Sequence, residues 1–357
     1  MRRGKNWMPV LTALMLAALA AQADPVDTVV KAAMARDRIP GVELTVIHHG
    51  RRVKTAAYGY SNLELRTPVT PDTVFEIGSI TKQFTAACIL LLAQEGKLSV
   101  DAPLSRYVPN TPPAWSNITL RHLLNHTSGL KTYTALKGFE STRQLSQAQF
   151  VEKLGALPLD SPPGERHAYC NTGFNLLGYV IENVGGQSYW SFLHARILGP
   201  LAMNATTNRE PRNLLPGRAN GYERDARGQF LNRDPNLTDL FAAGALVSTV
   251  GDLAKWNAAL DAGQVLTEAS KQQMWSPTRL NNGSLHPYGF GWWLDPVQGH
   301  RRIGHTGETS GFTASWERFP DDQLAVIVLC NSGQSEQADT VAKGVAALYF
   351  SKAGEGK

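Results

Sequence analysis

The chain has 357 residues, of which 43% are hydrophobic and 18% charged, and it contains three cysteines. Its length suffices for two units of core size at about 150 residues a unit, and it holds no repeat, low-complexity tract or linker. The formal charge of +5 falls to +2 without the basic residues Arg2, Arg3 and Lys5, so the basicity implies no nucleic-acid or acidic partner. Cys88 and Cys330 lie in apolar segments, which predicts buried packing residues and no disulfide framework.

Residues 1–23 have the pattern of a secretory signal peptide. A basic start is followed by an apolar run from Val10 to Ala21 and by the small-residue sequence Ala21-Gln22-Ala23. The run is too short for a stable membrane-spanning helix, and an uncleaved anchor is the alternative. We therefore expect an exported chain that starts near Asp24, periplasmic or secreted, with no membrane span after signal removal.

The remaining elements follow from hydrophobic periodicity. Residues 26–38 predict a helix, and residues 41–62 predict two strands around the turn His49-Gly50-Arg51. A long helix is expected after Ser79, ending at Gly96. Helical patterns then dominate to about residue 260, and one of the helices in this region is expected to begin near Asn175. Strand patterns return in four segments, 286–295, 301–308, 311–320 and 323–331, before a last helix over 336–350.

Strands at both ends of the chain with helices between them predict a mixed fold, α+β or α/β. We expect an antiparallel sheet built from N- and C-terminal strands and flanked by helices, with an inserted all-helical region. A single domain should cover residues 24–350, followed by a tail at 351–357. Within it, we expect a sheet subdomain at about 24–98 and 242–350 and a helical subdomain at about 99–241.

Ser79 and Lys82 form a Ser-x-x-Lys pair at the start of the long apolar helix. A serine hydroxyl is a poor nucleophile until a base removes its proton. A lysine three residues further on lies on the same helix face, and partial desolvation lowers its pKa so that a neutral amine can take that proton. The helix N-terminus also favours developing negative charge. The pair therefore predicts an activated serine, against the alternative of a capping serine beside an unrelated lysine.

The same spacing recurs at Ser128 and Lys131. This copy follows the helical segment 119–126 and is interrupted at once by Gly129. The pattern is typical of a helix end and a turn, with Lys131 in a loop. We therefore assign the chemistry to Ser79.

Tyr169 and Asn171 lie in a loop after Pro163-Gly164. A tyrosine hydroxyl can relay a proton when neighbouring cations depress its pKa, and an asparagine can both donate to a carbonyl and accept from an ammonium. Tyr60 and Asn62 share the spacing, but they stand at a strand end and are interpreted as a turn.

His305, Thr306 and Gly307 stand on a predicted strand, where a glycine allows close backbone approach. An exposed strand edge offers N–H groups to a substrate and to an oxyanion. The similar sequence from His126 to Gly129 lies at a helix end, and we interpret it as loop chemistry or packing.

Together these three segments resemble the penicillin-recognising serine acyltransferases: class C β-lactamases, related DD-peptidases, and esterases and D-aminopeptidases of the same fold. That family carries Ser-x-x-Lys, Tyr-x-Asn and Lys/His-x-Gly in this order. Segments 122–130, 242–256 and 288–293 also look like family segments, so the resemblance covers nearly all of the chain after residue 23. It implies the β-lactamase/transpeptidase-like fold.

The resemblance also implies residue roles. Ser79 would be the acylated nucleophile, and Lys82 and Tyr169 would share the proton transfers, with either as the base. Asn171 would orient Lys82 and the substrate amide. The strand at His305 and Thr306 would hold the substrate, packed closely at Gly307. The backbone N–H groups of Ser79 and Glu308 would form the oxyanion hole.

Two departures from the residues typical of this family bear on which substrate the protein would accept. His305 replaces the lysine of typical β-lactamases, and a mostly neutral histidine suits a substrate carboxylate less well than a fixed cation does. Glu308 could repel a carboxylate or attract an amine, or it could point to solvent. We therefore expect a D-alanyl-D-alanine carboxypeptidase-like enzyme or a related peptidase or esterase. Cys170, unusual between Tyr169 and Asn171, is expected to be a small filler.

The alternatives are a class C-like β-lactamase and a non-catalytic wall-binding or sensory module. The substrate would be a small molecule or peptide: a D-amino-acid peptide, an ester or a β-lactam. His122 and His126 have helical spacing but lack the glutamate of a zinc protease motif, so we expect no metal and no cofactor. The Gly-x-Ser-x-Gly motif of α/β-hydrolases is also missing from the sequence.

Overall fold

The computed structural model describes residues 24–136, 145–234 and 237–350. The predicted signal peptide at 1–23 and the tail at 351–357 lie outside the described residues. A six-stranded antiparallel sheet of order β11-β12-β13-β1-β2-β3 forms its centre. Its strands are β1 (Gly41–His48), β2 (Arg51–Asn62), β3 (Thr67–Pro68), β11 (Ile303–Thr309), β12 (Phe312–Phe319) and β13 (Leu324–Cys330).

The sheet joins the two ends of the chain. Strand β1 pairs with its hairpin partner β2 on one side and with β13 on the other, from Val42 opposite Cys330 to His48 opposite Leu324. Strand β11 lies at the edge of the sheet and pairs with β12, from Ile303 opposite Arg318 to Thr309 opposite Phe312, while its Gly304 also forms an isolated bridge with Trp293. The prediction of one antiparallel sheet built from N- and C-terminal strands is therefore confirmed.

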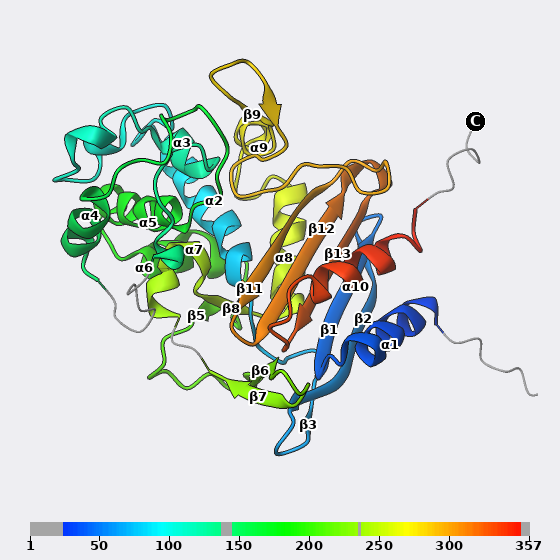
Figure 1. Ribbon diagram of the computed structural model, residues 1–357. Coiled ribbons are helices and arrows are strands. Elements are labelled where there is room, and N and C mark those ends of the chain that lie inside the picture. Colours follow the sequence, from blue (N-terminus) through cyan, green and yellow to red (C-terminus); the bar gives the residue numbers. More distant parts are fainter. Residues whose placement is uncertain (1–23, 137–144, 235–236, 351–357) are drawn as a thin grey trace, which may run out of the picture.

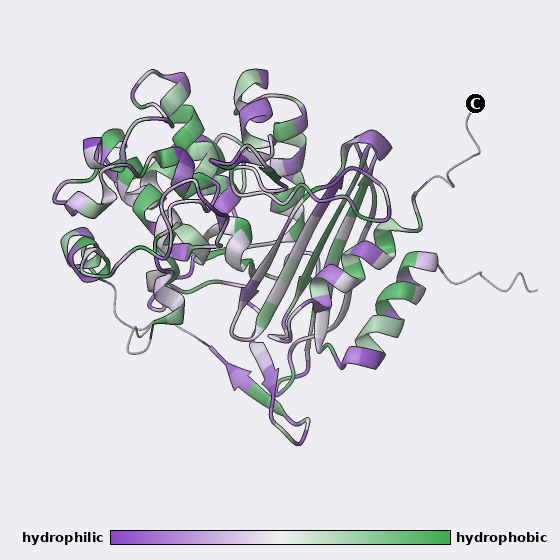
Figure 2. Ribbon diagram, turned by 45° about the horizontal axis from the view of Figure 1, so that its top comes forward, coloured by the Kyte–Doolittle hydropathy of each residue, from purple (hydrophilic) through white to green (hydrophobic). Residues whose placement is uncertain are grey.

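Helices cover both faces of this sheet (Figure 1). Helices α1 (Pro25–Asp37) and α10 (Gln337–Ala346) lie on one face, where their apolar sides pack on alternate residues of β1 and β13. Figure 2 shows hydrophobic turns alternating with hydrophilic ones along these two helices, as expected for half-buried helices. Helix α8 (Val250–Asp261) packs on the other face, where Ala254 meets Ile47 and Ala325.

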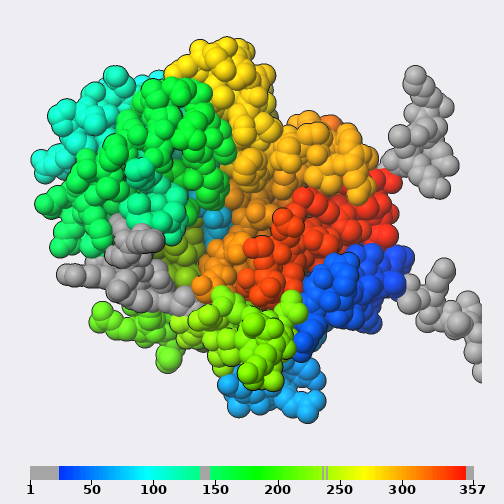
Figure 3. Space-filling model, in the orientation of Figure 1, coloured from blue at the N-terminus to red at the C-terminus, as the bar shows by residue number. Residues whose placement is uncertain are grey.

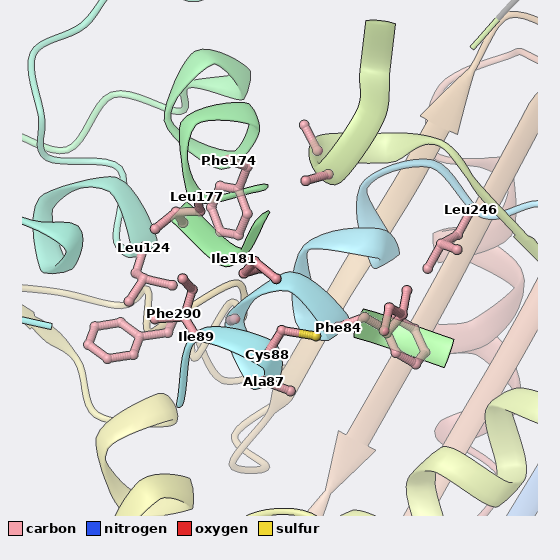
Figure 4. Close-up of a cluster of buried hydrophobic side chains, with 14 of the residues drawn as sticks. Phe84, Ala87, Cys88, Ile89, Leu124, Phe174, Leu177, Ile181, Leu246 and Phe290 are labelled. Carbon is pink, nitrogen blue, oxygen red and sulfur yellow. The ribbon is translucent and has the colours of Figure 1, made fainter. Parts of the chain in front are cut away.

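A second set of helices lies beside the sheet (Figure 1). It comprises α2 (Thr81–Gln94), α3 (Leu120–Leu124), α4 (Gln147–Gly155), α5 (Asn171–Gly185), α6 (Tyr189–Leu193), α7 (Phe241–Gly244) and α9 (Glu268–Met274). Helix α2 runs through the middle of this set, and every residue from Thr81 to Leu92 is buried. Figure 4 shows Ala87, Cys88 and Ile89 of α2 near side chains from α3 and α5, whereas Phe84 lies on the side of Leu246. The expected packing role of Cys88 is thus confirmed.

Short strands complete the molecule. They are β4 (Phe75–Glu76), β5 (Thr207–Asn208), β6 (Gly221–Arg224), β7 (Phe230–Arg233), β8 (Leu246–Ser248), β9 (Thr278–Arg279) and β10 (Leu285–His286). Strand β8 pairs with both β4 and β5. This pairing anchors the segment that leads into α2.

Two sequence predictions differ from the structure. Helix α5 begins at Asn171 rather than near Asn175, because Thr132 and the backbone around Lys131 supply hydrogen bonds to its first residues. Residues 286–295 were expected to form a strand, but only Leu285–His286 pair regularly. Gly291, with φ +76°, instead turns this segment against α2, where a Cβ would come within 3.0 Å of the Lys82 carbonyl oxygen.

No helix within the described residues is long and apolar enough to span a membrane.

Candidate active site

Ser79 and Lys82 lie where the chain enters α2. Ser79 is in a 3₁₀ turn, Gly78–Ile80, that leads directly into the helix, so its hydroxyl stands at the helix start as expected. Ser79 is half-buried, whereas the Lys82 side chain is fully buried. The Lys82 amine lies 2.9 Å from Ser79 Oγ, within hydrogen-bond distance. The pair therefore combines a reachable hydroxyl with a desolvated base.

The other partners of Lys82 determine what its amine can do. Nζ donates to Asn171 Oδ1 at 2.8 Å and to the carbonyl oxygen of Ala243 at 2.8 Å. A neutral amine has two N–H donors and one lone pair, and these two acceptors use both donors. The lone pair is then left for the Ser79 hydroxyl proton. Burial lowers the pKa of Lys82 well below its usual value, which favours this neutral form.

Asn171 and Tyr169 approach the pair from the start of α5. Asn171 Nδ2 donates to Thr134 Oγ1 at 3.1 Å, which turns Oδ1 toward Lys82. The Tyr169 ring lies 4.8 Å from Lys82 Nζ. Its hydroxyl is buried without a hydrogen-bond partner among the described residues, and burial raises its pKa while the nearby Ser79 hydroxyl opposes that shift. Tyr169 is thus held protonated beside the serine.

Strand β11 closes the other side of the site. Gly307 passes so close to the turn before α2 that a Cβ would stand 1.9 Å from the Ile77 carbonyl oxygen and 3.3 Å from Ser79 N. At Gly78, with φ +50°, a Cβ would stand 2.6 Å from Glu308 N. Only glycines allow this approach. The backbone amides of Ser79 and Glu308 are thereby brought to one place, as an oxyanion hole requires.

The side chains of β11 alternate between two environments. His305 is buried on the side of Tyr169, with 6.1 Å between the ring centroids. Thr306 and Glu308 line a cleft of about 650 Å³ on the other side, together with Asp295, Glu336 and Asp339. Glu308 is exposed, and its carboxylate accepts a hydrogen bond from Ser335 Oγ at 3.0 Å. Figure 3 shows a hollow between the helical set and the orange C-terminal strands.

A family model described as Beta-lactamase matches residues 26–349. The chain belongs to the β-lactamase family. It is 32% identical over 314 residues to penicillin-binding protein 4* of Bacillus subtilis (strain 168), covering 82% of this chain and 69% of that protein. It is 27% identical over 315 residues to protein flp of Staphylococcus aureus (strain MW2), covering 86% of this chain but only 62% of the relative.

A solved structure agrees with this assignment. The D-amino acid amidase from Ochrobactrum anthropi SV3, complexed with L-phenylalanine amide, superposes with a TM-score of 0.78 at 27% identity. The match covers 91% of this chain and 97% of the amidase. The predicted fold class is thus confirmed, and the chain is a member of a family of serine hydrolases of the β-lactamase and penicillin-binding type.

The second Ser-x-x-Lys has a different environment from the family motif. Ser128 is buried after α3, where its Oγ accepts from the Leu130 N–H at 3.3 Å. Lys131 forms an ion pair with Asp160 near the surface. The other rival motif also lies outside the site, since Tyr60 is exposed at the end of β2.

Two site groups were missed by sequence reasoning. Ala243 contributes only a carbonyl oxygen, which has no sequence signature. His126 was assigned to loop chemistry or packing, yet its ring lies 4.3 Å from that of Tyr169. Both of its ring nitrogens have partners, the Cys170 N–H and the Tyr288 hydroxyl, whereas His122 Nδ1 accepts from the Thr119 N–H at the start of α3. Cys170 is buried, as expected of a filler.

Proposed function

We propose that the protein hydrolyses an amide or ester through an acyl-enzyme on Ser79. One observation carries the proposal: the buried Lys82 amine lies 2.9 Å from Ser79 Oγ and has Asn171 Oδ1 and the Ala243 carbonyl oxygen as its other partners, so in its neutral form its lone pair faces Ser79. A binding module has no need for such an activated pair. Nucleophilic catalysis requires a base within hydrogen-bond distance of the nucleophile, and Lys82 and Ser79 are arranged in this way.

The proposed reaction has two halves. Lys82 takes the Ser79 proton as Oγ attacks the substrate carbonyl carbon, while the N–H groups of Ser79 and Glu308 stabilise the oxyanion. The bond to the leaving amine or alcohol then breaks as Tyr169 gives that group its hydroxyl proton, and the proton held by Lys82 passes to Tyr169, so Lys82 is the base and Tyr169 the proton donor. In the second half, Lys82 takes a proton from water as the water oxygen attacks the acyl carbon. The bond to Ser79 Oγ then breaks, Oγ regains that proton, and the acid product leaves.

The charges along β11 support a peptidase, amidase or esterase rather than a β-lactamase. Burial lowers the pKa of His305 to about 3, so this position carries no cation to hold a substrate carboxylate. The adjacent cleft is lined by Asp295, Glu308, Glu336 and Asp339, with Arg302 as the basic member. Arg302 is occupied by Glu317 and Asp295. Of the expected activities, that of a peptidase or esterase acting on a donor without this carboxylate therefore ranks above those of a D-alanyl-D-alanine carboxypeptidase-like enzyme and a class C-like β-lactamase, whose substrates both carry one.

A panel of acyl donors tests the proposal. The purified protein is incubated with an activated ester, a D-amino-acid amide, a peptide ending in D-alanyl-D-alanine and a chromogenic cephalosporin. We expect turnover of the ester and of an amide or peptide, and an acyl adduct on Ser79 by mass spectrometry of the intact protein. Rapid cephalosporin turnover alone would promote the β-lactamase alternative. A protein that forms no adduct with any donor would be a binding module instead.

We also propose that the protein is exported, on the basis of the signal-like pattern of residues 1–23. Expression of the full chain in a bacterial host should yield a processed protein that starts near Asp24 outside the cytoplasm. N-terminal sequencing of each cell fraction measures this. A full-length cytoplasmic product would contradict it.

A further inference from the structure

A chain of buried hydrogen bonds lies behind the site and is not used by the reaction proposed above. It starts at the backbone N–H of Cys170, which donates to His126 Nδ1 at 3.1 Å. His126 Nε2 lies 3.2 Å from the Tyr288 hydroxyl, which lies 3.1 Å from His305 Nε2. The chain ends where His305 Nδ1 meets the Thr306 carbonyl oxygen at 2.5 Å.

The two backbone ends give this chain one direction. Because a backbone N–H only donates, His126 Nδ1 must accept, and the neutral ring carries its proton on Nε2. Because a carbonyl oxygen only accepts, His305 Nδ1 must carry a proton. The His126 Nε2–H then donates to Tyr288, and the Tyr288 O–H donates to His305 Nε2. Each hydrogen bond of the chain then contains one proton, and this determines the tautomers of His126 and His305.

His126 holds Tyr169 on both sides. The residue before it, Ala168, donates its N–H to the His126 carbonyl oxygen at 2.8 Å, and the residue after it, Cys170, donates to the His126 ring. His126 adopts φ +59° at the end of α3 to make both bonds. Such a conformation is unfavourable for a residue with a side chain, so the surrounding contacts must hold it in place.

We propose that Tyr288 is a positioning residue of the active site, whose hydroxyl joins His126 behind Tyr169 to His305 on the substrate strand and holds each imidazole in a single tautomer. This role rests on the proposed function, since the residues it positions are the proton donor and the strand of that site. The hydrogen bonds of the Tyr288 hydroxyl link His126 of the helical set to His305 of the sheet. They therefore hold Tyr169 and β11 in a fixed relative position.

The surroundings of the two rings agree with this arrangement. Lys82 of α2 faces both imidazoles, Arg302 faces His305 from the start of β11, and His167 lies beside His126. Burial lowers the pKa of both histidines. A proton added to His305 Nε2 would also leave the Tyr288 hydroxyl hydrogen without an acceptor. His305 therefore supports strand β11 and offers the substrate no positive charge.

Imidazole NMR of the ¹⁵N-labelled wild-type protein tests the geometry without any activity. His126→Gln and His305→Gln assign the signals. We expect both rings to be neutral from pH 5 to 8, with the proton on Nε2 of His126 and on Nδ1 of His305. A reversed tautomer, or a His305 that titrates in this range, would overturn the proposal even if the enzyme turns over every donor.

Tyr288→Phe tests the positioning role and keeps the ring. We expect His305 to lose its single tautomer, and kcat for an activated ester to fall about three- to tenfold with KM changed less than about twofold, since both buried hydrogen bonds of the hydroxyl are lost. Tyr222→Phe is the control, because Tyr222 is equally buried and its hydroxyl accepts from the distant Leu63 N–H. An unchanged tautomer and kcat in Tyr288→Phe would refute the role. If no donor is turned over, the proposed function fails, whereas the tautomers measured by NMR still test the hydrogen-bond chain through Tyr288.

Discussion

The two Ser-x-x-Lys sequences have the same spacing and opposite environments. At Ser79 the hydroxyl is reachable and the lysine is buried without a carboxylate partner among its hydrogen bonds. At Ser128 the hydroxyl is buried and the lysine is half-exposed and paired with Asp160. A carboxylate and solvent both stabilise the ammonium form of a lysine, whereas burial among neutral acceptors destabilises it. The environment of the lysine, and not the spacing, therefore decides which serine has a base.

The largest expected effect separates the two serines. Ser79→Ala should lower the turnover of every acyl donor at least about 10⁴-fold, because it removes the attacking oxygen. Ser128→Ala should keep turnover within about threefold of wild type, since only a turn hydrogen bond is lost. Steady-state kinetics with an activated ester measures both. The opposite ranking would assign the chemistry to the second motif.

Arginine substitutions compare the two lysines. Lys82→Arg should lower kcat about 10²- to 10⁴-fold, because a guanidinium is not deprotonated in proteins and cannot act as a base. Lys131→Arg keeps the charge opposite Asp160 and should leave kcat unchanged. Adduct formation on Ser79 by mass spectrometry provides a second readout. Equal activity of Lys82→Arg and wild type would exclude Lys82 as the base.

The pH dependence of acylation follows from the same contrast. The pKa of Lys82 is lowered by burial, so the base form is present above that lowered value and is lost as the pH falls through it. The acylation rate should fall about tenfold per pH unit below this pKa and stay level above it. Stopped-flow acylation gives the profile, and Lys131→Met should not move it. A rate that is still climbing at about pH 10 would indicate a base with an ordinary lysine pKa.

The smallest effect concerns stability at the second motif. Ser128→Ala leaves the Leu130 N–H without its acceptor in a buried turn and should destabilise the fold by about 1 kcal/mol. Lys131→Met removes a surface ion pair and should cost less than about 1 kcal/mol. Urea denaturation at pH 7 measures both. A loss of several kcal/mol at Lys131 would mean that its ion pair is structural.

Much of this arrangement could be predicted from the sequence. The strand patterns at 301–308, 311–320 and 323–331 became β11, β12 and β13, and the long apolar segment after Ser79 became α2. Local periodicity carries that information because one face of each element is apolar. The start of α5 was misplaced because Asn171, Thr172 and Gly173 are weak helix formers, and the hydrogen bonds that Asn171 and Thr172 donate to the segment before them outweigh this preference.

The remaining site contacts depend on long-range packing. The Ala243 carbonyl, the Tyr288 hydroxyl and the His126 ring all come from segments far apart in sequence from the residues they contact. Nothing in the residue types around Tyr288 indicates that its hydroxyl is buried between two histidines. Only the placement of the helical set against the sheet brings these groups together.

The close packing of Gly307 on the turn at Gly78 has a consequence for biosynthesis. Residues 78 and 79 leave the ribosome long before residues 307 and 308, and β11 joins the sheet only through β12. The backbone amides of residues 79 and 308 therefore cannot converge until the last strands have docked, a step that follows the slow formation of long-range strand pairs. An incomplete nascent chain would carry Ser79 and Lys82 without the strand that packs beside them, so the proposed centre would be assembled only at the end of folding.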